Sequence, residues 1–322
     1  MALRFGLARS AALRDHQLVC LDPAGLNGAL MLARSRRSVV VIDAGTPRNA
    51  PAAGVHGFLS RDGMPPSELL ERGRTEVRGY GGQVMRGQVG SVVRENGWFR
   101  VMLADGQNLH ARRLLVATGL TDELPDITGL RERWGRDVIH CPYCHGWEVR
   151  DKAIGVIATG PTSVHQALLF RQLSDDVTFF SHTMPPDQPA QLTARGIRMV
   201  DGAVASVQVS DDRIVGIRLQ DGTVISRDVV VVSPRMTARA EILVPLGLRP
   251  VEHPAGTYIP SDATGRTEVP GVWVAGNVTD LAAHVGAAAA AGAVAGAHIN
   301  ADLVAEETGE AVALSATSQP RL

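Results

Sequence analysis

The feature that most constrains the fold is a strand–turn–helix–strand unit that occurs twice along the chain. The first copy is LVCLDPAGLNGALMLARSRRSVVVIDAG, in which two apolar runs flank a turn and a stretch with apolar residues at helical spacing. The segment AIGVIATGPTSVHQALLFRQLSDDVTFF repeats this order at nearly the same lengths. Because a βαβ unit places its strands parallel with the helix on one face, both segments predict a parallel sheet covered by helices.

A second pair of matching segments extends the duplication. GSVVRENGWFRVMLADG followed by RRLLVATG is matched about 115 residues later by ASVQVSDDRIVGIRLQDG followed by RDVVVVSP. Each copy therefore combines a nucleotide-type parallel sheet with a small antiparallel addition. The 322 residues are enough for about two domains. We expect an α/β protein of two Rossmann-like three-layer nucleotide-binding domains.

Composition and the ends of the chain limit the partners. Lys and Arg total 32 against 33 acidic residues, and only 4% of residues are aromatic, so we expect no nucleic-acid partner. The apolar VGAAAAAGAVAGA is shorter than the roughly 20 residues of a membrane span, and we interpret it as a buried helix. The initial MALRFGLARSAALR has neither a sustained apolar stretch nor a convincing cleavage site and reads as a loose leader. The final EETGEAVALSATSQPRL is expected to fray.

The turn after the first strand is where this fold binds a dinucleotide. In G-x-G-x-x-G the glycines let the backbone approach a pyrophosphate at a helix N-terminus. Those positions are Cys20, Asp22 and Gly25, so only the third glycine is kept, and Asp22 brings a negative charge toward the pyrophosphate. Asp43, 18 residues beyond Gly25, ends the next strand, where a carboxylate can accept hydrogen bonds from ribose hydroxyls. The alternative for Asp43 is an aspartate that only caps the strand.

The corresponding turn of the second copy is a weaker candidate for a nicotinamide nucleotide. Its small residues are compatible with a pyrophosphate, and the contacts there would come from Gly160, Pro161 and Ser163. The SHT that follows the next strand at 181–183 offers neither a ribose-binding acid nor the arginines that bind a 2′-phosphate. The pattern therefore argues against NAD(P)H at this site.

Two of the three cysteines form a CxxC motif flanked by histidines, in HCPYCHGWE at 140–148. Three cysteines are too few for a secreted disulfide scaffold, so we expect a cytoplasmic protein with a redox or metal role for the motif. A structural zinc ion takes about four ligands, and adjacent His–Cys pairs have poor geometry for one tetrahedral ion, so we expect no metal. A static disulfide across so short a loop would constrain little of the unfolded chain. A pair that alternates between dithiol and disulfide is favoured.

The order of these motifs resembles the low-molecular-weight thioredoxin reductases, members of the pyridine nucleotide-disulfide oxidoreductase superfamily. The resemblance rests on PAGL in the first turn, ATG at 117–119, the CxxC, and VPGVWVAGNVTD at 269–280. Within that group, CPYCHG followed by VIATGP is closest to the branch that includes the flavin dithiol oxidases of disulfide natural products such as gliotoxin and holomycin.

The resemblance implies a domain plan. Residues 1–119 and 247–322 would form a discontinuous FAD-binding domain, and residues 120–246 an inserted NAD(P)-binding-like domain that carries the CxxC. The family also implies a homodimer.

The resemblance further implies roles for the motif residues. Cys144 would be the sulfur beside the flavin, and Cys141 the outer sulfur that exchanges with substrate. His145 stands where thioredoxin reductases carry an acidic residue that acts as acid and base, and an imidazole suits that proton transfer. The alternative for His145 is a histidine satisfied in a polar turn. His140 either tunes the thiol or caps the structure.

The flavin contacts carry over in the same way. Asn277 replaces the aspartate that bonds the ribityl chain, and the helix that begins around His284 and Val285 would direct N–H groups at the pyrimidine ring. Residues 56–63 would form a loop over the flavin. The expected FAD contacts are Asp22, Pro23, Ala24, Gly25, Asp43, Arg48, Asn49, Ala117, Thr118, Gly119, Gly276, Asn277, His284 and Val285.

These features predict an FAD-dependent thiol–disulfide oxidoreductase that passes electrons between a dithiol or disulfide substrate, the Cys141–Cys144 pair and FAD. The other partner is oxygen in an oxidase or NAD(P)H in a reductase, and the weak second nucleotide turn favours the oxidase. The substrate is a small dithiol or disulfide, or a thioredoxin-like protein. The alternative is that the altered turn at Cys20 and Asp22 has abolished flavin binding, which would leave a non-enzymatic thiol or partner-binding protein.

Overall fold

A mixed seven-stranded sheet forms the centre of the first half of the molecule. The computed structural model describes residues 16–20 and 23–317. The sheet runs in the order β3 (Gln83–Arg86), β2 (Val39–Asp43), β1 (His16–Cys20), β6 (Asn108–Val116), β5 (Trp98–Leu103) and β4 (Val89–Glu95), with β19 (Val272–Val274) also paired to β6. Strands β3, β2, β1, β6 and β19 are parallel, whereas β4, β5 and β6 form an antiparallel meander. The first βαβ unit and its antiparallel addition are confirmed.

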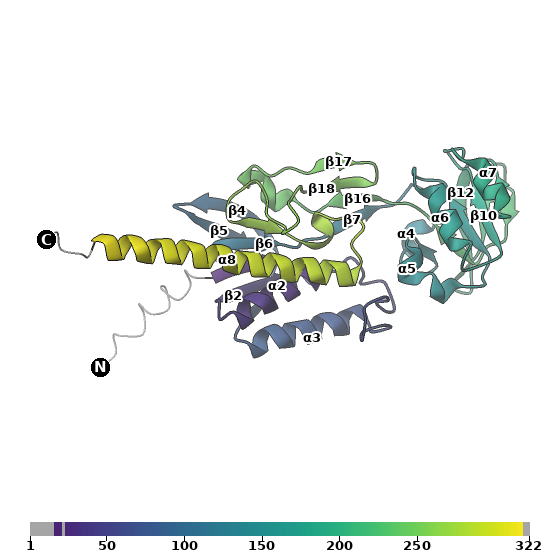
Figure 1. Ribbon diagram of the computed structural model, residues 1–322. Helices are drawn as coiled ribbons and strands as arrows, with labels where there is room; N and C mark the ends of the chain where they lie inside the picture. Colours follow the sequence, from purple (N-terminus) through teal and green to yellow (C-terminus); the bar gives the residue numbers. More distant parts are fainter. Residues whose placement is uncertain (1–15, 21–22, 318–322) are drawn as a thin grey trace.

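Helices α2 (Pro23–Arg34), α3 (Pro66–Gly79) and α8 (Val285–Thr317) lie together on one side of this sheet (Figure 1). The backbones of α2 and α8 approach closely because glycines lie at their crossing. A Cβ atom on Gly292 would lie 1.9 Å from the Ala24 carbonyl oxygen, and one on Gly296 would lie 2.6 Å from the Gly28 carbonyl oxygen. The small side chains along VGAAAAAGAVAGA therefore allow α8 to pack closely against α2. Close packing of this kind is expected from the interpretation of this segment as a buried helix.

Helix α8 is longer than the sequence pattern indicates. It continues to Thr317, so the prediction that the segment from residue 306 frays is wrong for residues 306–317. Ion pairs explain part of the extension, because Glu306 and Glu307 bond Arg113 and Arg112 of strand β6. By length and composition alone α8 could cross a membrane. Its packing on α2 and these ion pairs instead identify it as a helix of the sheet domain.

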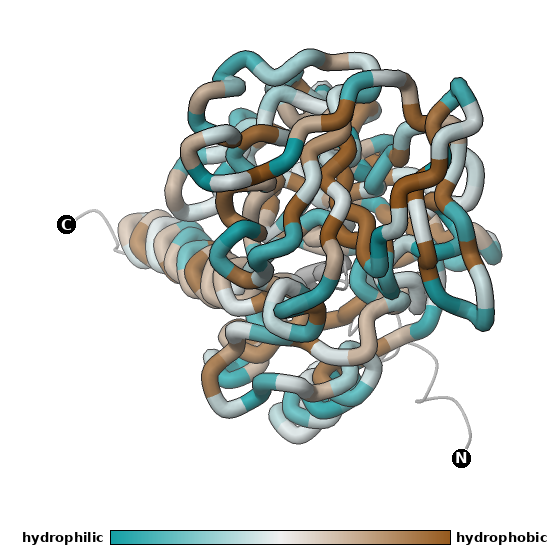
Figure 2. The backbone as a smooth tube through the Cα atoms, turned by 90° about the vertical axis from the view of Figure 1, so that its right-hand side faces the viewer, coloured by the Kyte–Doolittle hydropathy of each residue, from teal (hydrophilic) through white to brown (hydrophobic). Residues whose placement is uncertain are grey.

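A second, fully parallel sheet forms the centre of the inserted segment. Its five strands run in the order β11 (Arg198–Val200), β10 (Val177–Phe180), β9 (Ile154–Ile157), β15 (Val229–Val231) and β8 (Val138–Ile139). Helices α6 (Ser163–Phe170) and α7 (Pro189–Ala194) belong to it, and β12 (Val204–Ser210), β13 (Arg213–Leu219) and β14 (Val224–Ile225) form a separate antiparallel sheet. Figure 2 shows hydrophobic residues along the strands facing the viewer and hydrophilic ones at the turns. The second βαβ unit and the predicted fold class are confirmed.

A four-stranded sheet joins the two halves. It runs in the order β17 (Val251–His253), β18 (Gly256–Tyr258), β16 (Arg235–Ala238) and β7 (Leu120–Glu123), and the crossing strands β7 and β16 pair antiparallel. The domain limits at 119/120 and 246/247 stay a prediction.

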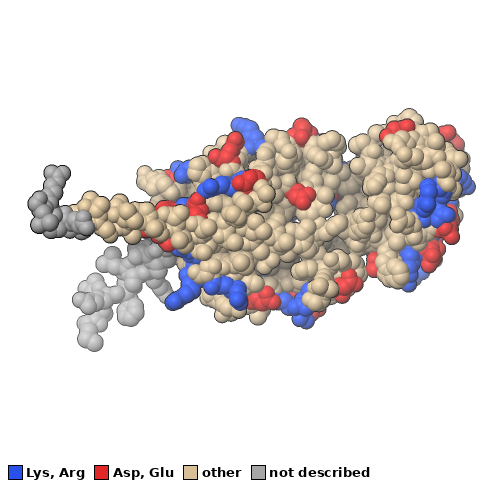
Figure 3. Space-filling model, viewed as in Figure 1, with Lys and Arg blue, Asp and Glu red and all other residues tan. Residues whose placement is uncertain are grey.

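Short helices complete the described chain, and the surface carries charges of both signs. These helices are α4 (Leu130–Arg133), α5 (Pro142–His145), η1 (Trp147–Val149), η2 (Glu241–Leu246) and η3 (Gly276–Val278). On the face shown in Figure 3, basic and acidic residues are interspersed rather than gathered into one patch.

The α2–α8 contact gives a test of the fold. We expect Gly292→Ala to lower the free energy of unfolding by about 1–3 kcal/mol, because the added methyl would collide with the Ala24 carbonyl of α2. Gly309→Ala on the same helix meets no atom within 4 Å and should raise stability by about 0.5–1 kcal/mol through helix propensity. Urea unfolding measures both changes. Similar effects of the two substitutions would contradict the close contact.

Candidate redox-active site

Cys141 and Cys144 are joined as a disulfide at the start of a short helix. Cys141 has an extended backbone and directly precedes α5, whose first residue, Pro142, is suited to a helix N-terminus. The Cys141 carbonyl accepts hydrogen bonds from the N–H groups of Cys144 and His145 at 3.3 and 3.2 Å. This turn holds the two Cα atoms 5.3 Å apart, within the range that a disulfide needs.

The disulfide opens into a cavity of about 800 Å³ that also contains most of the expected flavin contacts. The cavity is lined by Cys141, Cys144 and His145, and by the expected FAD residues Pro23, Asp43, Arg48, Asn49, Thr118, Gly119, Asn277, His284 and Val285. Ala24, Gly25, Ala117 and Gly276 are buried. Asp22 lies outside the described residues, and of Cys20 only the backbone is described, so the effect of the altered turn stays a prediction. The fold thus brings the motif and the expected flavin contacts into one space.

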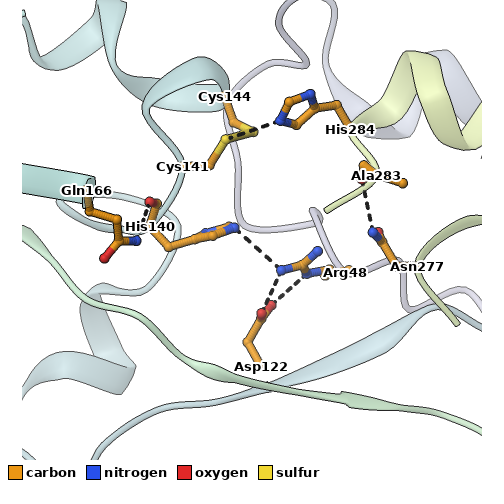
Figure 4. The surroundings of a disulfide bond; sticks show 9 residues. All are labelled: Arg48, Asp122, His140, Cys141, Cys144, Gln166, Asn277, Ala283 and His284. Carbon is orange, nitrogen blue, oxygen red and sulfur yellow. Dashed lines mark hydrogen bonds and ion pairs between the residues drawn. A yellow bond between two sulfur atoms is a disulfide. The ribbon is translucent and has the colours of Figure 1, made fainter. Parts of the chain in front are cut away.

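The two sulfurs of the disulfide have different surroundings. Cys141 is buried, with 8% of its surface exposed, whereas Cys144 is half-buried. The Cys141 sulfur lies 3.7 Å from Nε2 of His284, which immediately precedes α8 (Figure 4). The His284 ring also contacts the Tyr143 ring, with their centroids 5.9 Å apart. A residue distant in sequence therefore supplies the imidazole beside the outer sulfur.

His145 is a second imidazole near the disulfide. It lines the cavity, but both of its ring nitrogens are buried without a hydrogen-bond partner among the described residues. Burial lowers the pKa of His145, an effect that the nearby Glu148 carboxylate partly opposes. The alternative of a histidine satisfied in a polar turn is not what this conformation shows. Its role in proton transfer stays a prediction.

A cluster of three polar side chains lies between strand β7 and the CxxC motif and consists of Arg48, Asp122 and His140 (Figure 4). The Arg48 guanidinium donates two hydrogen bonds to the Asp122 carboxylate, at 2.8 and 2.7 Å, and its Nη2 lies 3.5 Å from Nε2 of His140. The His140 ring stacks on Trp134. Burial and the Arg48 charge lower the pKa of His140 to about 4, so this imidazole is neutral near pH 7.

Asp122 was missed in the sequence because it lies outside the recognised motifs. Its position on β7, directly after ATG, places it at the junction of the two halves. The sequence shows only an acidic residue in a strand that follows the ATG segment. That pattern does not indicate which residue the acid pairs with. The pairing with Arg48 spans 74 positions in sequence.

Asp43 and Asn277 line the cavity but are already engaged by the protein. The Asp43 carboxylate accepts a hydrogen bond from the Gly45 N–H at 2.6 Å and pairs with Arg74 at 2.8 Å. The ribose role of Asp43 therefore stays a prediction beside an observed structural one. The Asn277 amide nitrogen donates to the carbonyls of Asp280 and Ala283, each at 3.0 Å, which leaves the amide oxygen as the atom that can accept from a ligand.

The segment at 56–63 lies against the start of α8. It forms a turn closed by the Gly57 N–H bonded to Asp62 at 2.9 Å, and a Cβ atom on Gly286 would lie 3.6 Å from Phe58. The preceding residues 54–56 line the cavity. These contacts fit the predicted covering loop.

The second nucleotide turn is closed by its own side chains. The N–H groups of Thr159 and Gly160 are directed to the Ser163 hydroxyl at 3.2 and 3.3 Å. After β10, the Ser181 hydroxyl donates to Asp201 at 2.9 Å, and His182 accepts from the Val204 N–H at 3.0 Å. Groups that a dinucleotide would use are therefore occupied within the protein.

A metal centre is a weaker use of the motif. Among the residues described, the ligand atoms of Cys141, Cys144 and His284 lie within 4.8 Å of one another. Both sulfurs are bonded to each other, and a structural zinc ion takes about four ligands. The cluster is better suited to thiol chemistry.

Comparison with known proteins identifies the family of the chain. Residues 22–293 match the family described as pyridine nucleotide-disulphide oxidoreductase. The thioredoxin reductase tcpT of Claviceps purpurea (strain 20.1) is 31% identical over 313 residues, which cover 92% of this chain and 96% of that protein.

Solved structures agree in both sequence and fold. The crystal structure of HlmI is 47% identical, with a TM-score of 0.89 and coverage of 95% of this chain and 97% of HlmI. The oxidoreductase from Agrobacterium tumefaciens is 35% identical, with a TM-score of 0.85 over 90% of this chain and 98% of that one. The chain therefore belongs to the pyridine nucleotide-disulphide oxidoreductase family and is a thioredoxin reductase-like thiol–disulfide oxidoreductase.

Proposed function

We propose that this protein uses FAD to oxidise a small dithiol to its disulfide. The observation that carries the proposal is the Cys141–Cys144 disulfide, which opens into the same cavity as the expected flavin contacts. FAD, when bound there, supplies a two-electron acceptor next to the disulfide.

The residues of the cavity fit such a cofactor. The first N–H groups of α8, from Val285 on, offer donors with a positive helix-dipole end. Gly119 has a φ of +70°, and the space beside its Cα is open, so its backbone can approach a ligand closely. The Asn277 amide oxygen and the Asp43 carboxylate can accept hydrogen bonds from hydroxyl groups. Donors and acceptors are thus available for both the ring system and the polyhydroxy chain.

The thiol chemistry follows from the motif. A substrate thiolate attacks Cys141, the bond between the two sulfurs breaks, and Cys144 leaves as a thiolate facing the cofactor site. The second substrate thiol then displaces Cys141, which closes the product disulfide. His145, on the cavity wall, is a candidate proton carrier for Cys144.

Two observations favour a small dithiol and oxygen over thioredoxin and NAD(P)H. Cys141 is only 8% exposed, whereas exchange with a protein partner needs an accessible sulfur. The second nucleotide turn directs its N–H groups to Ser163. We propose, from the family, that the protein is a homodimer.

The first prediction from the proposed function concerns colour and electron transfer. The purified protein should be yellow, and anaerobic dithiothreitol should bleach its flavin absorption. Cys144→Ser should slow this bleaching by on the order of 100-fold or more, because the sulfur next to the cofactor is lost. A folded, colourless protein that takes up no added FAD would instead support the flavin-less alternative.

The second prediction separates the two directions of electron flow. With a dithiol in air, we expect oxygen uptake and turnover, and we expect NADPH under anaerobic conditions to reduce the flavin far more slowly than the dithiol does. Stopped-flow absorbance at the flavin band measures both rates. Rapid reduction by NADPH without oxygen uptake would assign the protein to the reductases.

The third prediction concerns His140 and acid stability. Because its pKa is near 4 in the folded protein and about 6.5 when unfolded, the unfolded state binds the proton first as the pH falls. Stability should therefore decrease between pH 6.5 and 4, by up to about 2–3 kcal/mol from this group. His140→Gln should flatten this decrease, whereas substitution of the exposed His298 by Gln should not. Urea unfolding over this pH range measures the slope, and an unchanged slope in His140→Gln would contradict the assignment.

A further inference from the structure

We propose that His284 is the acid and base that serves Cys141 during exchange with the substrate. This inference rests on the proposed function. Its first support is the distance of 3.7 Å between the Cys141 sulfur and Nε2 of His284, which is within the range of a sulfur–imidazole hydrogen bond. The partners are 143 residues apart in sequence, so only the fold brings them together.

The contrast between the two candidate imidazoles supports the assignment. His145 neighbours Cys144 in sequence, yet its ring nitrogens contact no hydrogen-bonding atom among the described residues. His284 points its Nε2 at the outer sulfur, and its side chain belongs to an exposed residue (Figure 4). An exposed imidazole can exchange protons with solvent between turnovers, whereas a buried one without partners cannot do so directly.

Asn277 holds His284 in place. Its amide nitrogen donates to the carbonyl of Ala283, the residue before His284, and to the carbonyl of Asp280 in the same turn. The Ala282 N–H donates to the Asp280 carboxylate at 3.0 Å and closes this turn further. An aspartate at 277 has no N–H to donate, and its charge would face two carbonyl oxygens. This explains why an asparagine stands here, and it makes Asn277 a positioning residue.

The proton and electron steps balance as follows. Nε2 of His284 takes the proton of the first substrate thiol, and the resulting thiolate forms a bond to the Cys141 sulfur while the Cys141–Cys144 bond breaks. The second substrate thiol, after losing its proton to solvent, attacks the substrate sulfur of this mixed disulfide and releases Cys141. Cys141 then receives the proton from His284. Two electrons pass from the substrate to the cysteine pair, and FAD, when bound, would supply the acceptor that reoxidises the pair.

Other ionisable groups near the disulfide are less suited to this task. Arg48 is paired with Asp122, His140 is neutral near pH 7, and Glu148 lies 3.5 Å from His56. Within the described part of the chain, none of these groups forms a hydrogen bond with either sulfur. His284 is therefore the residue whose loss should affect exchange at Cys141 most directly.

The experiment compares variants of the flavin-loaded, full-length protein under anaerobic conditions. We expect His284→Ala to slow flavin reduction by dithiothreitol at pH 7 by about 100-fold, a typical value for the loss of a general base. Each variant is first loaded with FAD to the same occupancy, and reduction by dithionite, which bypasses thiol exchange, should then proceed at the wild-type rate. The defect should shrink toward pH 9–10, where dithiothreitol ionises without help. His298→Ala, an exposed histidine on α8, is the matched control and should behave like the wild type.

Two further variants keep the inference testable if His284→Ala folds poorly. His284→Gln preserves bulk, and Asn277→Asp removes the two hydrogen bonds that support the turn while keeping an oxygen that can accept from the cofactor. With both variants loaded with FAD, we expect the same pH-dependent defect, smaller in Asn277→Asp. A larger loss in His145→Ala than in His284→Ala would overturn the assignment, as would a loss of equal size at every pH. Failure of the wild type to be bleached by dithiothreitol would contradict the proposed function itself, whereas normal bleaching in His284→Ala would contradict only this inference.

Discussion

The antiparallel pairing of β7 with β16 is the contact on which the arrangement of the site depends. The chain leaves the first sheet through β7 and returns through β16, with Leu120 opposite Ala238 and Glu123 opposite Arg235. These strands are the two covalent connections between the halves, so their register determines where the motif lies. With this register the disulfide opens into the cavity of the first half. Thiol chemistry and the expected cofactor site are therefore adjacent without any sequence proximity.

Charge neutralisation within the cavity has a consequence for the cysteines. Arg48 lies near the motif, with its guanidinium 3.5 Å from His140, but two hydrogen bonds to Asp122 balance its charge. His140 is held neutral by its low pKa. Neither Arg48 nor His140 thus offers an unbalanced positive charge to a thiolate on Cys141, and a histidine that gains and loses a proton, as proposed for His284, could stabilise it.

The sequence predicts local patterns well, because they arise from residues close along the chain. The apolar runs around Val39–Asp43 and Ile154–Ile157 predict strands, and the spacing of Cys141 and Cys144 predicts a redox pair. Contacts between residues far apart in the sequence leave no such local pattern. The meeting of His284 with Cys141 depends on the register of the crossing strands. Likewise, the extension of α8 beyond residue 306 depends in part on ion pairs with β6. The spacing of hydrophobic residues along α8 gives no indication of these ion pairs.

The burial of Cys141 limits which substrates can reach it without a rearrangement of the two halves. A large protein substrate would require the inserted half to turn about β7 and β16 until Cys141 is exposed. Such a turn breaks the contact of Arg48 with the neutral His140 and the partly exposed pair of His56 with Glu148, and a pair of the second kind is worth only about 0–1 kcal/mol. The turn also separates His284 from Cys141, because His284 belongs to the first half and Cys141 to the second. Under the role proposed for His284, exchange occurs in this closed arrangement, and that favours a substrate small enough to enter the cavity.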